Sequence, residues 1–477
     1  MRTRLFFSKA HQTMKSNTAH LTDLEGNWNY LTNWAKRSKL IQLNDHKLSF
    51  RKPGHGHQFV YGGDLCDKGP GDLRIGQLLL DFKYSKPNNV HLIAGNREIK
   101  CRRFTYELNA NIKKRLLTGP AAFWNKTKSP FHYVIEQMRY ESKQNQSPRD
   151  MALFLESKSI IECQTLYLKW MLNETMGCGA MNNKPSTFEF RRQELALING
   201  VALQAIDDFM VTQSFIDSVS PNGVITQYLK ESQLGVVIDD TLFIHGAVTL
   251  ENLGYLPGMN DSSLRMTNAR EWISALNDWY KAQISQWIKH PIEEELLAPG
   301  HHALDQYVLF NPKSVITTNW YQHGKLAPIP DKVVQFLNKA GIYRVISGHQ
   351  PFSDFPLIIR QANLEVIVGD TGYSDPGAAN DNRGAASHNL ELTHGGDKSF
   401  VTIDAIKRDG VEIHMGLPSR QQIKSNKDAP IGHFTETGEL IRPLDDKLLV
   451  ASQLNGYEVE DKVIIPSASN LATYRPQ

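Results

Sequence analysis

The chain has 477 residues, of which 40% are hydrophobic and 22% are charged, and its formal net charge is +3. This length predicts two or three domains, and the composition is that of an ordinary globular protein. The net charge is too small to indicate binding to nucleic acid, and no window approaches the 18 apolar residues of a membrane span.

The amino terminus and the cysteines give two further constraints. The basic start of the chain contains only a short apolar run, so we expect no cleavable signal peptide. The cysteines show no paired spacing and no CxxC motif, which predicts a reducing compartment and no structural zinc. They are Cys66, Cys101, Cys163 and Cys178.

Residues 19–100 alternate between short apolar runs and amphipathic segments. We expect strands that end near Leu21, at Tyr61 and at Ala94, with helices over 27–39 and 73–82. Alternating strands and helices favour an α/β fold, in which polar side chains gather at the carboxyl ends of the strands. The segment is predicted to be the first part of the core.

Residues 101–235 have a different character, because strand-like runs disappear and segments rich in Leu, Lys, Glu, Gln and Ala follow one another. Glycine and proline separate predicted helices over 104–117, 121–140, 151–172 and 188–209. We interpret this region as an inserted all-helical subdomain that serves as a cap or as a docking surface for a partner.

Residues 236–418 return to the mixed pattern and are predicted to complete the core. We expect strands over 236–244, 345–347 and 364–368, helices over 270–288 and 332–340, a small polar stretch over 374–396, and a hairpin over 400–415. Residues 419–477 contain only short strand-like pieces, so we expect a small β appendage or a partly disordered tail.

Five short polar blocks each follow an apolar run: TDLEGN, YGGDLCDKGPGD, AGNRE, FIHGA and SGHQP. If the runs are strands, the blocks place oxygen and nitrogen donors at strand ends, and such donors suit a hard cation. The donors are Asp23, Glu25, Asp64, Asn96, His245 and His349. The alternatives are helix caps for the two aspartates, a turn for the asparagine, and ordinary core positions for the histidines.

In this order the blocks resemble those of the calcineurin-like metallophosphoesterases. Within these they are most similar to the protein serine/threonine phosphatase branch, whose blocks read GDxHG, GDxxDRG, GNHE and HGG, with a later histidine after Gly or Ala. The resemblance covers roughly residues 20–100 and 235–390. It implies a β-sandwich flanked by helices, here with the all-helical insertion.

The resemblance also implies two divalent metal ions, most often Mn²⁺, with Mg²⁺ or iron as alternatives. Asp64 would bridge them, Asp23 and Glu25 would bind one, and the other would take the remaining donors, Asn96, His245 and His349. Two such cations lower the pKa of a water that attacks phosphorus and neutralise charge on the phosphoryl oxygens.

Two positions depart from the family pattern. Glu25 stands where the family has a metal-binding histidine, and a carboxylate there favours Mn²⁺ or Mg²⁺ over softer ions. Arg97 stands where the family has the histidine of GNHE, which is implied to pair with Asp67 and to protonate the leaving group. Arginine does not give up its proton, but it can bind phosphate bidentately. We therefore expect Asp67 to hold Arg97 by an ion pair.

Two further cations complete the predicted phosphate contacts. Lys68 replaces the arginine of the family's GDxxDRG block, so it offers a point charge in place of a planar fork. Arg383 lies in DNRGAAS, which is similar to a DNAGA-type stretch that closes the active site in the family. It is either a third phosphate contact or a solvent-exposed arginine in a turn.

The resulting functional hypothesis is a metal-dependent phosphoprotein phosphatase that acts on phosphomonoesters. Without the general-acid histidine, a tyrosine phenolate with a pKa of about 10 leaves more easily than a serine or threonine alkoxide, so phosphotyrosine is favoured. The altered motifs and the helical insertion are also similar to the Wip-type effector phosphatases of Legionella. This implies a phosphorylated protein as substrate and a location in the cytoplasm or, by a non-classical route, in a host cell.

Two alternatives remain open. The GHQP sequence resembles the GHTP of hydrolases that act on dinucleoside polyphosphates or other phosphoanhydrides. The changes at Glu25 and Arg97 also suit a catalytically weak pseudophosphatase that binds phosphorylated partners.

Overall fold

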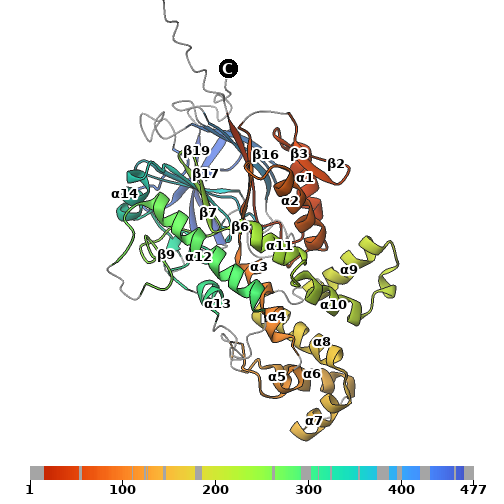
Figure 1. Ribbon diagram of the computed structural model, residues 1–477. Helices are drawn as coiled ribbons and strands as arrows, with labels where there is room; N and C mark the ends of the chain where they lie inside the picture. The colour runs from red at the N-terminus through yellow and green to blue at the C-terminus, as the bar shows by residue number, and fades with distance from the viewer. Residues whose placement is uncertain are drawn as a thin grey trace, which may run out of the picture.

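The protein is seen here in a computed structural model, which shows a mixed α/β architecture with several sheets (Figure 1). No helix in the part of the chain described by the model is long and apolar enough to cross a membrane. The described residues are 16–52, 56–109, 111–122, 125, 127–142, 147–177, 185–259, 264–291, 302–309, 311–322, 325–352, 355–372, 386–394, 400–418, 430–455 and 458–466.

The larger sheet has seven strands in the order β16-β15-β14-β1-β4-β5-β6. β1, β4, β5 and β6 run parallel, so the carboxyl ends of the first three meet at one edge. β14, β15 and β16 extend the sheet in antiparallel fashion beyond β1. The bounds are β1 Asn17–Leu21, β4 Gln58–Tyr61, β5 Val90–Ile93, β6 Ser232–Gln233, β14 Ala386–Thr393, β15 Phe400–Lys407 and β16 Glu412–Pro418.

The second sheet has five strands in the order β12-β13-β11-β8-β7. Its central strands β8, β11 and β13 are parallel. Val60 and Ile93 of the first sheet share one buried cluster with Phe243, Ile346 and Ile367 of the second, so the two sheets pack face to face. The bounds are β7 Gly235–Ile238, β8 Thr241–Ile244, β11 Arg344–Ser347, β12 Leu357–Gln361 and β13 Leu364–Val368.

Helices follow the strands and cover the outer faces. The amphipathic pattern predicted for the first of them is present, since Tyr30, Leu31, Trp34 and Ala35 form the buried face of α1. Asn27 accepts a hydrogen bond from the Tyr30 amide and so caps this helix. The bounds are α1 Trp28–Arg37, α2 Asp72–Ser85, α3 Asn96–Cys101, α12 Ala269–Lys289, α13 Ala303–Val308 and α14 Asp331–Lys339.

The described part of 101–231 is helical, and Figure 1 shows α4 to α8 extending away from the sheets. Three of the four predicted long helices are divided; for example, Ser159 caps a new helix, and Gly200 ends another with a left-handed φ of 64°. The helix predicted over 121–140 begins only at Pro130. The bounds are α4 Arg103–Glu107, α5 Ile112–Thr118, α6 Pro130–Ser142, α7 Pro148–Ser157, α8 Ile160–Trp170, the π-helical turn η1 Met171–Thr175, α9 Thr187–Asn199, the 3-10 turn η2 Leu203–Ala205, α10 Asp208–Ser218 and α11 Val224–Glu231.

The last of these helices lies against the sheets. Tyr228 of α11 is buried, its ring meets that of Tyr61 edge to face, and its hydroxyl donates to the Ile93 carbonyl oxygen at 2.8 Å. This helix therefore packs beside α2 against the first sheet, and it returns the chain to β6.

The structure differs from the sequence analysis or adds to it at three places. The single strand expected over 236–244 is a hairpin, β7–β8, whose turn places Asp239 at a φ of 52°. The polar stretch 374–396 contains β14, which pairs with β1 despite its polar residues. A further hairpin, β2 (Ile41–Asn44) with β3 (Lys47–Phe50), was not predicted.

The carboxyl-terminal segment forms a three-stranded antiparallel sheet of β17 (Leu440–Pro443), β18 (Leu448–Asn455) and β19 (Glu458–Pro466). The Arg360 amide donates to the Gly432 carbonyl oxygen at 2.6 Å, which joins the segment to the edge strand β12. A short two-stranded ribbon, β9 (Tyr321–Gln322) with β10 (Lys325–Leu326), lies beside it.

Candidate metal centre and phosphate site

The polar blocks converge where the two sheets meet. Asp23, Asp64 and Asn96 follow the parallel strands β1, β4 and β5, whereas His245 and His349 follow β8 and β11 of the other sheet. The His349 amide donates to the Asp23 carboxylate at 3.1 and 3.2 Å. Hydrogen bonds therefore join the loop of Asp23 in the first sheet to the loop of His349 in the second.

The backbone of these loops is strained. Nine residues other than glycine have a positive φ in the described part of the chain, and five of them are predicted site residues. Such left-handed conformations cost free energy in non-glycine residues and concentrate at functional sites. The five are Asp23, Glu25, Asp64, Asp67 and His349, with φ of 51°, 45°, 55°, 118° and 74°.

Two glycines allow the loops to approach so closely. A Cβ at Gly95 would lie 2.3 Å from the Asp64 amide nitrogen, and a Cβ at Gly348 would lie 2.1 Å from Oδ2 of Asp23. Neither position tolerates a side chain, so the glycines of the AGNRE and SGHQP blocks are needed for the geometry.

Asp64, His245 and His349 each place a donor atom within 4.8 Å of the other two. Nδ1 of His245 donates to the Gly62 carbonyl oxygen at 2.8 Å, which leaves Nε2 facing Oδ1 of Asp64 at 3.3 Å and Oδ1 of Asn96 at 3.4 Å. The buried Nδ1 of His349 has no hydrogen-bond partner among the described residues. This arrangement fits a divalent cation, because metal-ligating histidines are fixed by their other nitrogen and their donor points into the site.

The charges of the site also suit a cation. Burial would raise the pKa of the Asp64 carboxyl, but His245, Arg97 and His349 outweigh it and hold that pKa well below its usual range. Burial lowers the pKa of His245, yet Asp64 dominates and raises it to about 10. Burial and the adjacent His245 lower the pKa of His349 to about 3. Burial and Asp370 raise the pKa of Asp23 well above its usual range. A divalent cation would replace the proton on His245 and relieve the crowded carboxylates.

Arg97 lies among carboxylates beside this donor set. Its Nε lies 2.7 Å from Oε1 of Glu25 and 3.2 Å from Oδ2 of Asp64, and its Nη1 lies 3.0 Å from Oδ2 of Asp67. Lys68 reaches the other oxygen of Glu25 at 3.2 Å. The expected ion pair between Asp67 and Arg97 is present. Glu25 bridges two cationic side chains, so its role as a metal ligand stays a prediction.

Two carboxylates that the sequence analysis did not select belong to this neighbourhood. Asp370 follows β13, and burial together with Glu25 raises its pKa to about 7. Glu98 accepts hydrogen bonds from the amides of Gly95 at 2.7 Å and Leu65 at 3.2 Å, so it holds two of the loops together. Both residues have a feature in the sequence that could have identified them. Asp370 follows a strand and a glycine, and Glu98 has the Gly-x-x-Glu spacing of a capping box.

Not every selected residue can be placed. Arg383 lies outside the described residues, so its phosphate contact stays a prediction. Cys66 and Cys101 are free, buried thiols with their sulfurs 3.7 Å apart, and together with Asp67, the partner of Arg97, they form a second group of donor atoms.

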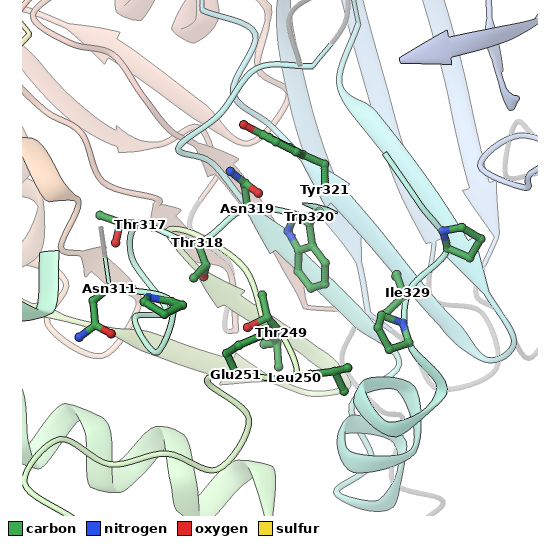
Figure 2. A pocket seen from close by; sticks show the side chains of 14 residues that line it. Thr249, Leu250, Glu251, Asn311, Thr317, Thr318, Asn319, Trp320, Tyr321 and Ile329 are labelled. Atoms are coloured by element: carbon green, nitrogen blue, oxygen red, sulfur yellow. The ribbon is translucent and has the colours of Figure 1, made fainter. Parts of the chain in front are cut away.

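A cavity of about 380 Å³ lies beside the histidine loops. Trp320 in its wall donates from Nε1 to Oγ of Ser347 at 3.0 Å, and Thr318 donates to the Ala247 carbonyl oxygen at 3.0 Å. Figure 2 shows the Trp320 indole with Thr249 on one side and Ile329 on the other. The cavity is therefore built on the residues that flank His245 and His349.

A comparison with known protein families gives a match in the amino-terminal part of the chain. Residues 16–151 match the family model of the calcineurin-like phosphoesterases. This part of the chain is therefore similar to a calcineurin-like phosphoesterase domain. This is a hydrolase family whose members typically bind two metal ions. The matched segment carries Asp23, Asp64 and Asn96 and ends before His245.

Among solved structures, the chain is similar to a protein serine/threonine phosphatase from Saccharomyces cerevisiae with similarity to human phosphatase PP5. The two are 11% identical, the match covers 86% of this chain and 81% of that chain, and the TM-score is 0.33. No curated protein matches the chain.

Proposed function

We propose that this chain is a metal-dependent phosphoprotein phosphatase that hydrolyses phosphomonoesters and favours phosphotyrosine. The observation that carries the proposal is the position of Arg97, which lies beside the donors Asp64, His245 and His349 and is held by Asp67. When bound, two divalent cations, with Mn²⁺ suited to the carboxylate-rich donor set, supply an activated water and neutralise phosphoryl charge.

The chain's own residues define what the site does with the phosphoryl group. Arg97 and Lys68 place two positive charges at the edge of the donor set, where they bind and orient phosphoryl oxygens. Arg97 keeps its proton at physiological pH, so it stabilises negative charge but does not protonate the leaving oxygen. The leaving group therefore departs as an anion, which favours a phenolate over an alkoxide.

The test compares turnover of two peptides of the same sequence that carry phosphotyrosine or phosphoserine. The wild type is expected to prefer phosphotyrosine. Arg97→His is the matched variant, because it restores a group that can protonate the leaving oxygen, and general acids contribute about 10²- to 10⁴-fold. It should shift the ratio of kcat/KM values toward phosphoserine. A wild-type preference for phosphoserine would contradict the proposed role of Arg97.

The cavity beside the histidine loops favours one second candidate, a phosphoanhydride hydrolase. Its walls include Trp320 and Tyr321, and aromatic side chains of this kind can pack against a nucleobase. Hydrolysis of a dinucleoside polyphosphate with a higher kcat/KM than that of the phosphotyrosine peptide would select this candidate over the phosphoprotein phosphatase.

A further inference from the structure

The turn between α9 and α10 concentrates exposed apolar side chains. Fourteen large hydrophobic residues are exposed in the described part of the chain, and six of them fall between positions 197 and 210. Patches of this kind on a protein surface mark interaction sites. We call the following six residues the apolar tip: Leu197, Ile198, Val201, Leu203, Phe209 and Met210.

The apolar tip is convex. α9 ends at Asn199, Gly200 reverses the chain with a left-handed φ of 64°, and η2 leads into α10. Every residue from 197 to 205 is exposed. Figure 1 shows this turn at the outer edge of the molecule, away from the sheets. The apolar tip is therefore suited to insertion into a partner, and it does not form a groove that could bind one.

The loop of the apolar tip is uncharged, and charged residues begin at Asp207 and Asp208, just before Phe209. No residue from Leu195 to Ile206 carries a charge. At the base of the helix pair, Arg192 pairs with Glu189 at 2.8 Å and also with Asp208, and Lys169 pairs with Asp208 at 2.7 Å. The adjacent Asp207 is exposed and caps α10 by accepting from the Met210 amide at 2.8 Å. The base thus carries no excess of positive charge.

We propose that the apolar tip docks this protein on a lipid bilayer by inserting into the boundary between headgroups and acyl chains. Energetically dominant protein–protein contacts are rich in Trp, Tyr and Arg and poor in Leu and Val. The tip has none of the first three and is mainly aliphatic, which suits hydrocarbon. Its convex shape and its uncharged loop over 195–206 suit the same partner, and its stability on the bilayer comes from apolar burial.

The other end of α9 contacts the segment from Asp67 to Arg74. Arg191 pairs with Asp72 at 2.8 Å, the Glu194 carboxylate accepts from the Arg74 amide at 3.0 Å, and the Thr187 hydroxyl donates to the Asp67 carbonyl oxygen. α9 has 13 residues, so it spans about 20 Å. A docked tip would hold the metal centre at that order of distance from the bilayer and select phosphorylated substrates at its surface.

The experiment measures co-sedimentation of the full chain with neutral phosphatidylcholine vesicles. The wild type is expected to bind. Added phosphatidylserine should not strengthen binding, and added salt should not abolish it, because the base of the helix pair carries no excess of positive charge. Leu197→Glu/Leu203→Glu should lower the partition coefficient at least about tenfold, since it removes the burial of two leucine side chains, each worth about 1.5–3 kcal/mol. Leu153→Glu is the matched control, because Leu153 is an exposed leucine on α7 of the same helical region.

All variants should hydrolyse para-nitrophenyl phosphate in solution at the wild-type rate, which shows that the fold and the metal centre are intact. The proposal is overturned if the wild type does not bind vesicles or if the double variant binds as well as the wild type. It is also overturned if light scattering shows a dimer that the double variant dissociates, since the tip would then be an interface between copies. Lipid binding is measured without turnover, so its failure is distinguishable from failure of the phosphatase proposal.

Discussion

Replacing Asp67 by asparagine removes one negative charge from beside Arg97 and keeps the shape of the side chain. The pair joins Nη1 of Arg97 to Oδ2 of Asp67 at 3.0 Å, and the two side chains are 16% and 3% exposed. Glu25 and Asp64 also contact the guanidinium, so the buried charge of Arg97 keeps partners in the variant. We therefore expect little loss of stability and a clear loss of activity.

The magnitude follows from the kind of hydrogen bond. A bond from the Arg97 guanidinium to a neutral amide remains in the variant, so only the attraction between the two charges is lost. This loss is about 1–2 kcal/mol, between the value of about 0–1 kcal/mol for an exposed ion pair and that of about 3–5 kcal/mol for a broken buried pair. This corresponds to a fall in kcat/KM of roughly 5- to 30-fold if Arg97 contacts the transferred phosphoryl group. The melting temperature should change by no more than a few degrees.

The assay is a double-mutant cycle with Asp67→Asn and Arg97→Ala, followed by hydrolysis of para-nitrophenyl phosphate. If Asp67 acts through Arg97, its substitution should have almost no further effect on kcat/KM in the Arg97→Ala background. Full additivity of the two effects would refute the reasoning, because it would mean that Asp67 contributes to the reaction independently of Arg97.

Two other predictions concern stability and metal binding. Glu365→Gln should destabilise the fold by about 3–5 kcal/mol, because it leaves Arg344 and Arg360 buried without the carboxylate that each contacts at 2.7 Å. Burial raises the pKa of Glu365, but the two arginines outweigh it and lower the pKa below 4.5; the stabilisation is therefore complete above that pH and is lost as the pH falls through the folded-state pKa. Denaturation at neutral and acid pH should show that the free energies of unfolding of the wild type and the variant approach each other only in acid. If they moved further apart in acid, the pKa of Glu365 would not be lowered in the folded protein. Added Mn²⁺ should raise the melting temperature of the wild type by an amount equivalent to about 2.7 kcal/mol at a concentration 100-fold above Kd, whereas His349→Ala should lose most of this shift; an equal shift in both proteins would remove His349 from the ligand set.

Much of the site was predictable because the relevant signals are local. A short apolar run followed by Asp or His identifies a strand end, and parallel strands bring such ends to one edge. Asp23, Asp64 and Asn96 could be placed this way. The hairpin turn at Asp239 was missed because Asp239 and Asp240, which separate two short apolar runs, were not interpreted as a turn. β14 was missed because it is polar and its pairing with β1 spans most of the chain.

Residues whose role depends on distant partners were less accessible. Glu98 holds the loops of Gly95 and Leu65 together, and the sequence gives no sign of the second contact. The pairing of Arg97 with Asp67 was expected, but its simultaneous contacts with Glu25 and Asp64 depend on the sandwich bringing three loops to one point. Asp370 lies after a strand of the other sheet and carried no family block. Long-range packing decides these cases, and local pattern does not encode it.

Metal-dependent hydrolysis of para-nitrophenyl phosphate by the wild type and by Asp64→Asn tests the central claim most directly. Asp64 contacts both His245 and Arg97 and shares the donor cluster with His349. We predict turnover by the wild type that requires Mn²⁺ and is lost in Asp64→Asn, with the variant still folded. Absence of turnover with any divalent metal in folded wild-type protein, or equal turnover in the variant, would contradict the account, and the first of these results would favour a pseudophosphatase that binds phosphorylated partners.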